Sequence, residues 1–298
     1  MTENIAVAIV HGTGSKEPDF ADDIMDQLQR CFPRHLPEAA RQRAGIIMEP
    51  VYWADKTREK ENEIWERVLQ AGRLDFQGLR RFLFNVCGDT LAYQPSEGRL
   101  ELYQAVHRVM AEAFQRLAER AGEDAPLCVV AHSMGTVVVH NYLYDIQNHT
   151  PFTEGLPRPE TPLERSDTLA LLCTYGSPLA LWRLRFGEDY QAIRFPGESV
   201  EARYPGLKPR WLNIYDVDDV LGYPLSTVTE HYEEMARQGY LQDCPQEVGG
   251  YFSGFYSAIF GLLGNTPIAH KGYFRDSRSL NRMAGYIAET WQGCYDNR

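Results

Sequence analysis

The sequence lacks the features that mark several classes of binding protein. Its six cysteines include no Cys-x-x-Cys pair, and no two of its eight histidines have the spacing of metal ligands. Its net charge of −11 leaves no excess of positive charge for the phosphate backbone of a nucleic acid. We therefore expect no metal, no other cofactor and no nucleic-acid partner.

Signs of export and of a membrane span are also lacking. Residues 1–4, Met-Thr-Glu-Asn, have neither the basic start nor the long apolar region of a signal peptide. We therefore expect the cysteines to be reduced thiols and the protein to be cytoplasmic. The uncharged stretch 248–270 approaches the length of a membrane-spanning helix, but its glycines, its serines and Pro267 favour a buried or pocket-lining segment.

What the chain does contain is an alternation of apolar runs with amphipathic segments. Short apolar runs typical of buried strands lie at 5–10, 46–53, 126–132, 169–175 and 211–215. Helices are predicted between and after them, most clearly at 18–32, 99–120 and 278–291. This alternation predicts an α/β fold, a three-layer sandwich in which a mostly parallel central sheet carries helices on both faces.

No repeat, low-complexity tract or flexible linker divides the chain, so we expect residues 1–298 to form a single domain. Three stretches are longer than a normal strand–helix connection and are interpreted as insertions, at 55–97, 148–167 and 182–209. The first combines many charges with an apolar face and predicts a helical hairpin. Such a hairpin either covers a site as a lid or decorates the periphery, and the residues favour neither.

The stretch 126–144 combines a valine-rich strand, a sharp turn at Ser133 and a helical segment. A serine held on such a turn is exposed above the strand end and can act as a nucleophile. Small residues are needed because the strand and helix backbones pass close together, and here they are Ala131 and Gly135. The usual pattern has glycine at both places, so Ala131 is a departure. The alternative is a strand–turn–helix unit with a chance Ser-x-Gly.

A glycine-rich loop, His-Gly-Thr-Gly-Ser at 11–15, directly follows the first predicted strand. In a serine hydrolase such a loop supplies an amide that stabilises the oxyanion, and the amide of Thr13 is the candidate beside that of Met134. A phosphate-binding loop is the competing interpretation. It is disfavoured because no Gly-Lys-Ser or Gly-Lys-Thr follows.

A serine nucleophile needs a base within hydrogen-bond reach, and the base needs an acid that orients it. Three carboxylates, Asp216, Asp218 and Asp219, crowd the turn after the strand at 211–215. Two histidines follow them. His231 lies in a segment typical of an exposed helix face, whereas His270 lies in a loop, which makes His270 the preferred base. His11 is expected to hold the glycine-rich loop in shape.

Taken together, these motifs resemble α/β-hydrolases of the lipase and esterase type. The matching pieces are His-Gly-Thr-Gly at 11–14, Ala-His-Ser-Met-Gly at 131–135, Tyr-Gly-Ser-Pro-Leu at 175–179, Asp219-Val220 with Pro224 behind it, and His270 with Tyr273. The order Ser, Asp, His is the order of that fold. The resemblance implies that Asp219 is the orienting acid, with Asp216 as the runner-up, and that Ser133, Asp219 and His270 form a catalytic triad.

The expected function is hydrolysis of a carboxylic ester through an acyl-enzyme intermediate, and the expected substrate is a small ester or acyl compound, a class that includes lipids. Five aromatic residues could line an apolar acyl pocket: Tyr251, Phe252, Phe255, Tyr256 and Phe260. The same triad would also serve a thioesterase, an acyltransferase or a peptidase. A non-catalytic, partner-binding module with a hydrolase-like fold is the alternative from another class.

Overall fold

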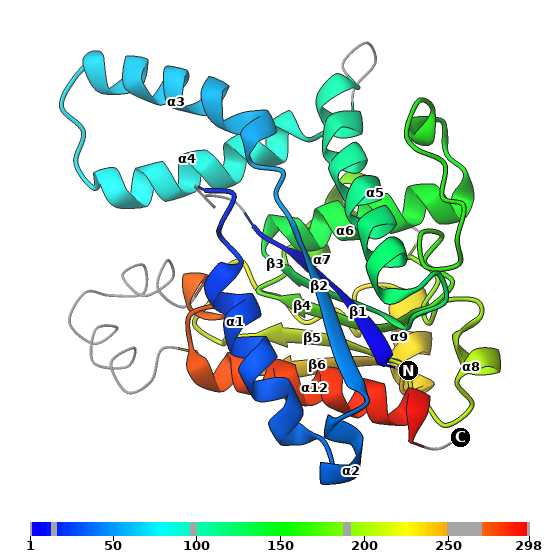
Figure 1. The fold of residues 1–298 in the computed structure, drawn as a ribbon. Helices are drawn as coiled ribbons and strands as arrows, with labels where there is room; N and C mark the ends of the chain where they lie inside the picture. Colours follow the sequence, from blue (N-terminus) through cyan, green and yellow to red (C-terminus); the bar gives the residue numbers. More distant parts are fainter. Residues whose placement is uncertain (1, 13–16, 96–99, 187–191, 249–269, 297–298) are drawn as a thin grey trace.

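The computed structural model of the chain describes residues 2–12, 17–95, 100–186, 192–248 and 270–296. At its centre is a six-stranded sheet in the order β2-β1-β3-β4-β5-β6, and every neighbouring pair is parallel (Figure 1). The strands are β1 (Glu3–Val10), β2 (Ala44–Val51), β3 (Leu127–His132), β4 (Leu169–Tyr175), β5 (Arg210–Tyr215) and β6 (Leu241–Pro245). The predicted α/β class is confirmed, and the sheet is wholly parallel.

Helices bury both faces of the sheet (Figure 1). Side chains on β1 alternate between two apolar cores, because successive residues of a strand point to opposite faces. Ile5, Val7 and Ile9 pack in the core under α1 (Asp22–Cys31) and α12 (Ser277–Tyr295). The alternate β1 residues, Ala6, Ala8 and Val10, pack in the core under α5 (Glu101–Ala121) and α6 (Met134–Asn148). Burial on both faces explains why the inner strands are continuous apolar runs.

The predicted insertion at 55–97 contains two helices, α3 (Asp55–Gln70) and α4 (Gln77–Ala92). They form a hairpin that extends from the end of the molecule where the parallel strands finish (Figure 1). The ring of Trp65 on α3 meets that of Phe84 on α4, with centroids 5.3 Å apart. The hairpin therefore has a small apolar contact of its own, and its α4 helix lies near the strand ends.

The other predicted insertions contain short elements. The segment 148–167 holds the 3-10 helix η2 (Pro151–Thr153) and turns. The segment 182–209 overlaps the end of α7 (Leu179–Phe186) and contains α8 (Val200–Arg203). The other short helices in the described ranges are α2 (Glu38–Arg41), η1 (Phe32–His35) and α9 (Glu230–Arg237).

The edge strand β6 was not predicted from the sequence. Its residues are Leu-Gln-Asp-Cys-Pro, and only Leu241 among them is buried. β6 has no continuous apolar run because most of its side chains remain partly or fully exposed. Within the described ranges no helix is both long and apolar enough to cross a membrane, and residues 249–269 of the uncharged stretch lie outside those ranges. All six cysteines are free, as predicted.

Candidate active site

Ser133 occupies a strained turn between β3 and α6. Its backbone φ of 54° and ψ of −129° place a residue that is not glycine at positive φ. Such a conformation costs of order 1–3 kcal/mol and persists only where the surroundings enforce it. Here the Ser133 amide donates a 2.8 Å hydrogen bond to the carbonyl of Tyr175, and Ser133 is only 2% exposed. The turn thus holds the hydroxyl at the carboxyl end of the sheet.

Two glycines allow the loop after β1 to approach this turn. A Cβ on Gly135 would lie 2.3 Å from the carbonyl oxygen of His11. A Cβ on Gly12 would lie 2.5 Å from the Cβ atom of Ser133. Neither contact is possible for a real side chain, so glycine is required at both positions. Ala131 departs from the usual motif without penalty, because it lies within β3 and its methyl group packs in the core under α5 and α6.

Ser133, His270 and Asp219 form a buried chain of hydrogen bonds. His270 Nε2 lies 2.6 Å from Ser133 Oγ, and His270 Nδ1 lies 3.0 Å from each carboxylate oxygen of Asp219. An ionised carboxylate can only accept, so Nδ1 carries the proton and Nε2 is free to accept the one on the Ser133 hydroxyl. Ser133 follows β3 and Asp219 follows β5, so parallel strands bring them to one edge of the sheet.

The environment of Asp219 favours its charged form. Burial alone would raise the pKa of Asp219, but hydrogen bonds to its carboxylate outweigh burial and lower the pKa below its usual value. The donors are His270, the amide of Leu221 at 3.0 Å and the hydroxyl of Tyr273 at 2.9 Å. Asp219 is therefore ionised at neutral pH, as an acid that orients a histidine must be. Tyr273 was part of the sequence motif, but its contact with Asp219 was not predicted.

The runner-up acid, Asp216, has a different set of partners. Its carboxylate accepts hydrogen bonds from the amides of Asp218 at 2.9 Å and Val248 at 2.6 Å. Burial raises the pKa of Asp216. These contacts make Asp216 a support for the turn, whereas Asp219 faces the histidine. His231, the other histidine considered as a base, is exposed on α9, as its sequence suggested.

His132, next to the serine, holds the histidine in place. Its Nε2 lies 2.6 Å from the carbonyl oxygen of His270, and the two rings are 4.9 Å apart. A carbonyl oxygen only accepts hydrogen bonds, so His132 Nε2 carries a proton and donates the hydrogen bond. Burial lowers the pKa of His132 to about 3, which keeps the ring neutral. This positioning role was missed, because the two residues are far apart in the sequence and no local pattern links them.

His11 holds the loop after β1, as predicted. Its Nδ1 donates to the carbonyl of Gly12 at 2.6 Å, and its Nε2 accepts from the amide of Trp53 at 3.1 Å. The Trp53 indole donates in return to the His11 carbonyl at 3.0 Å. Burial lowers the pKa of His11 to about 4, so a neutral ring makes both contacts. The loop is thereby tied to the end of β2.

Acid should destabilise the protein through its buried histidines. Burial lowers the pKa to about 3 or 4 in four of them, His11, His107, His132 and His140. Below about pH 6.5 these histidines bind protons in the unfolded chain but not in the folded protein. Their contribution to the free energy of unfolding is therefore complete above that pH and falls as the pH drops toward about 4. At about pH 5 the loss is about 1–2 kcal/mol per histidine. Asp145 and Glu61 act in the opposite direction, because burial raises their pKa values to about 6 and about 8.

Urea unfolding at about pH 7.5 and about pH 5 measures this effect. We expect a large net loss of unfolding free energy at the lower pH, because the histidines outnumber the opposing carboxyl groups. Replacing the exposed His231 with glutamine is the matched control and should leave the difference unchanged. An equal or higher stability at the lower pH would contradict the burial of neutral histidines.

Of the two predicted oxyanion donors, Thr13 lies outside the described residues and Met134 lies within them. Met134 is the first residue of α6, so its amide is among the helix N–H groups that have no intrahelical acceptor. The positive end of the helix dipole adds to the attraction for a negative oxygen beside Ser133. The Met134 amide therefore remains a candidate donor, at the helix N-terminus directly after Ser133.

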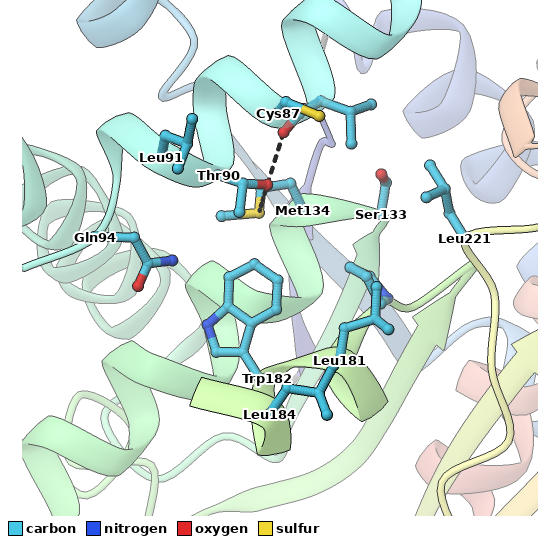
Figure 2. A pocket seen from close by; sticks show the side chains of 12 residues that line it. Cys87, Thr90, Leu91, Gln94, Ser133, Met134, Leu181, Trp182, Leu184 and Leu221 are labelled. Atoms are coloured by element: carbon cyan, nitrogen blue, oxygen red, sulfur yellow. Dashed lines mark hydrogen bonds between the residues drawn. The ribbon is translucent and has the colours of Figure 1, made fainter. Parts of the chain in front are cut away.

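A pocket of about 670 Å³ opens beside Ser133 (Figure 2). This volume lies within the range of about 300–1,000 Å³ common for small-molecule sites. Its walls come from α4 of the hairpin, from α7 and from the two turns that carry Ser133 and Asp219. The lining residues are Val86, Cys87, Thr90, Leu91, Gln94, Ser133, Met134, Pro178, Leu181, Trp182, Leu184 and Leu221. Most of this surface is aliphatic, aromatic or sulfur-containing, so it suits an apolar ligand group. The five aromatic residues predicted as a pocket lining lie at 251–260, outside the described residues.

No protein-family model matches the chain, and no curated protein matches it. Among the described residues, no three histidine, cysteine, aspartate or glutamate side chains are placed to hold a metal ion.

Proposed function

We propose that the protein is a serine hydrolase of the α/β-hydrolase type that cleaves carboxylic esters. The observation that carries the proposal is the hydrogen-bonded chain from Ser133 through His270 to Asp219, at the mouth of an apolar pocket. The strained turn at Ser133 and the order Ser, Asp, His along the chain support the same family. A non-catalytic module has no need to hold these three groups within hydrogen-bond distance.

In the acylation step, Ser133 Oγ attacks the ester carbonyl carbon while its proton passes to His270 Nε2. The carbonyl oxygen becomes an oxyanion, and the amides of Met134 and Thr13 stabilise it by hydrogen bonds. Asp219 stays ionised and stabilises the imidazolium that forms. When the tetrahedral intermediate collapses, the C–O bond to the leaving group breaks, and His270 returns the proton to the departing alkoxide. The acyl group is left as an ester on Ser133.

In the deacylation step, His270 takes a proton from a water molecule, and the resulting hydroxide attacks the acyl carbon. The second tetrahedral intermediate releases the carboxylic acid, and the proton on Nε2 returns to Ser133 Oγ. The apolar pocket beside Ser133 holds the acyl chain in both steps. In this proposal the α3–α4 hairpin acts as a lid, because α4 supplies four of the pocket-lining residues and Gln94 follows it.

The apolar pocket predicts a preference for longer acyl chains. From p-nitrophenyl acetate to the octanoate, kcat/KM should rise by about threefold or fourfold per methylene while the chain remains within the pocket, since burying a methylene is worth about 0.8 kcal/mol. Ser133→Ala should hydrolyse none of the esters above background. A series with no rise beyond acetate would contradict the acyl role of the pocket, and activity that survives Ser133→Ala would contradict the proposed function. Matched thioesters would distinguish a thioesterase from an esterase.

A further inference from the structure

Two polar side-chain groups line the pocket away from Ser133. Gln94, just after α4, and Trp182, in α7, lie there, and Figure 2 shows them across the pocket from Ser133 and Leu221. Gln94 Oε1 and Trp182 Nε1 are buried from solvent, and neither has a hydrogen-bond partner among the described residues. Trp182 is only 6% exposed. Within the described part of the chain, a donor and an acceptor from separate elements are thus both unpaired in a mostly apolar pocket.

An unpaired buried polar group destabilises the folded protein, and such groups are rare unless a ligand or water completes them. The nearby Thr90 hydroxyl differs, since it donates to the Val86 carbonyl at 2.6 Å. A phenylalanine at 182 and a leucine at 94 would fill the same space without unpaired atoms. In Figure 2 the indole nitrogen of Trp182 is turned toward the side where Gln94 lies.

We propose that the preferred acyl group carries a hydroxyl group at the end of its chain. That hydroxyl oxygen accepts from Trp182 Nε1–H, and its proton is donated to Gln94 Oε1, so one group satisfies both unpaired atoms. A terminal methyl group satisfies neither. A terminal carboxylate offers no donor to Gln94, and none of the described lining residues carries a positive charge to balance it. The substrate class is therefore an ester of an ω-hydroxy acid, an inference that rests on the proposed function for the identity of the acyl site.

Binding, measured without turnover, separates this inference from the hydrolase proposal. Ser133→Ala protein is titrated by calorimetry with paired free acids, from hexanoic to dodecanoic acid, each with and without an ω-hydroxyl group. At the length that reaches Gln94 and Trp182, we expect the hydroxy acid to bind about tenfold more tightly than its plain partner. Equal binding at every length, or tighter binding of the plain acid throughout, would overturn the inference even if Ser133 proves to be the nucleophile.

Two variants locate the effect. Trp182→Phe keeps an aromatic ring and removes the N–H group, and Gln94→Leu removes the amide. In each variant the hydroxy acid and the plain acid should bind with nearly equal affinity, because the plain acid still binds and the hydroxyl group has lost a partner. Trp291→Phe is the matched control, because its indole N–H donates to the Glu3 carbonyl and is outside the pocket. In Trp291→Phe the ratio of hydroxy-acid affinity to plain-acid affinity should equal the ratio measured for the Ser133→Ala protein without it. A preference that survives both pocket variants would overturn the inference, and Gln94→Leu alone decides the matter if Trp182→Phe does not fold.

Discussion

Replacing His270 with glutamine should lower kcat/KM for ester hydrolysis by about 10⁵-fold, because the side chain that removes the proton from Ser133 is lost. Glutamine has a similar size, and its amide can still donate a hydrogen bond to the Asp219 carboxylate. It has no group that accepts and returns a proton near neutral pH. Loss of the base also removes most of the rate enhancement that Ser133 provides, because the contributions of the triad residues to catalysis are not additive. Initial rates with p-nitrophenyl butyrate measure the change.

His231→Gln provides the matched control, because it is the same substitution at the exposed histidine of α9. Its kcat/KM should equal that of the unmodified protein. Urea unfolding of both variants separates a loss of chemistry from a loss of folded protein. The assignment of His270 as the base would be wrong if His270→Gln kept activity within about tenfold of the parent while folded.

Replacing Asp219 with asparagine should lower kcat by about 10³–10⁴-fold. The amide of the new side chain can donate toward His270 Nδ1, which favours the tautomer with its proton on Nε2. That tautomer cannot accept the proton of Ser133, whose oxygen lies 2.6 Å from Nε2. The substitution also removes the negative charge that stabilises the imidazolium. The rate should therefore fall while binding of the acyl group in the apolar pocket changes little.

The neighbouring carboxylates supply controls for this experiment. Asp218 is exposed, so Asp218→Asn should leave kcat unchanged. Asp216→Asn should cost far less than Asp219→Asn, since the Asp216 carboxylate contacts the amides of Asp218 and Val248 and supports the turn. A larger loss of kcat in Asp216→Asn than in Asp219→Asn, with both proteins folded, would reverse the choice of acid.

The buried parts of this fold could be predicted from the sequence, because their residues satisfy one strong local requirement. Residues 169–175, all buried in β4, form a continuous apolar run that fits a strand covered on both faces. β6 could not be recognised, since an edge strand with one buried residue has no such run. The glycine loop and the Ser133 turn were found because a close backbone approach restricts the residue types at Gly12 and Gly135.

The site itself was less accessible to sequence reasoning. Asp216 and Asp219 lie in one turn, and only the packing of that turn against His270 and Tyr273 determines which carboxylate faces the histidine. His270 lies in a helical turn at 270–272 and not in the predicted loop. The support that His132 gives to His270 joins residues 138 positions apart, so it has no local signature. The pocket is also non-local, because α4, α7 and the turn after β5 each contribute part of its wall.

Fluorophosphonate labelling followed by peptide mass spectrometry tests the central claim, that Ser133 is a nucleophile activated by His270. The reagent phosphonylates an activated serine with loss of fluoride and needs no knowledge of the substrate. The account predicts a single adduct on the peptide that contains Ser133 in the unmodified protein. It predicts no adduct in Ser133→Ala, and labelling that is slower by about 10³-fold or more in His270→Gln. Failure of the folded, unmodified protein to react, or an adduct that persists in Ser133→Ala, would contradict it.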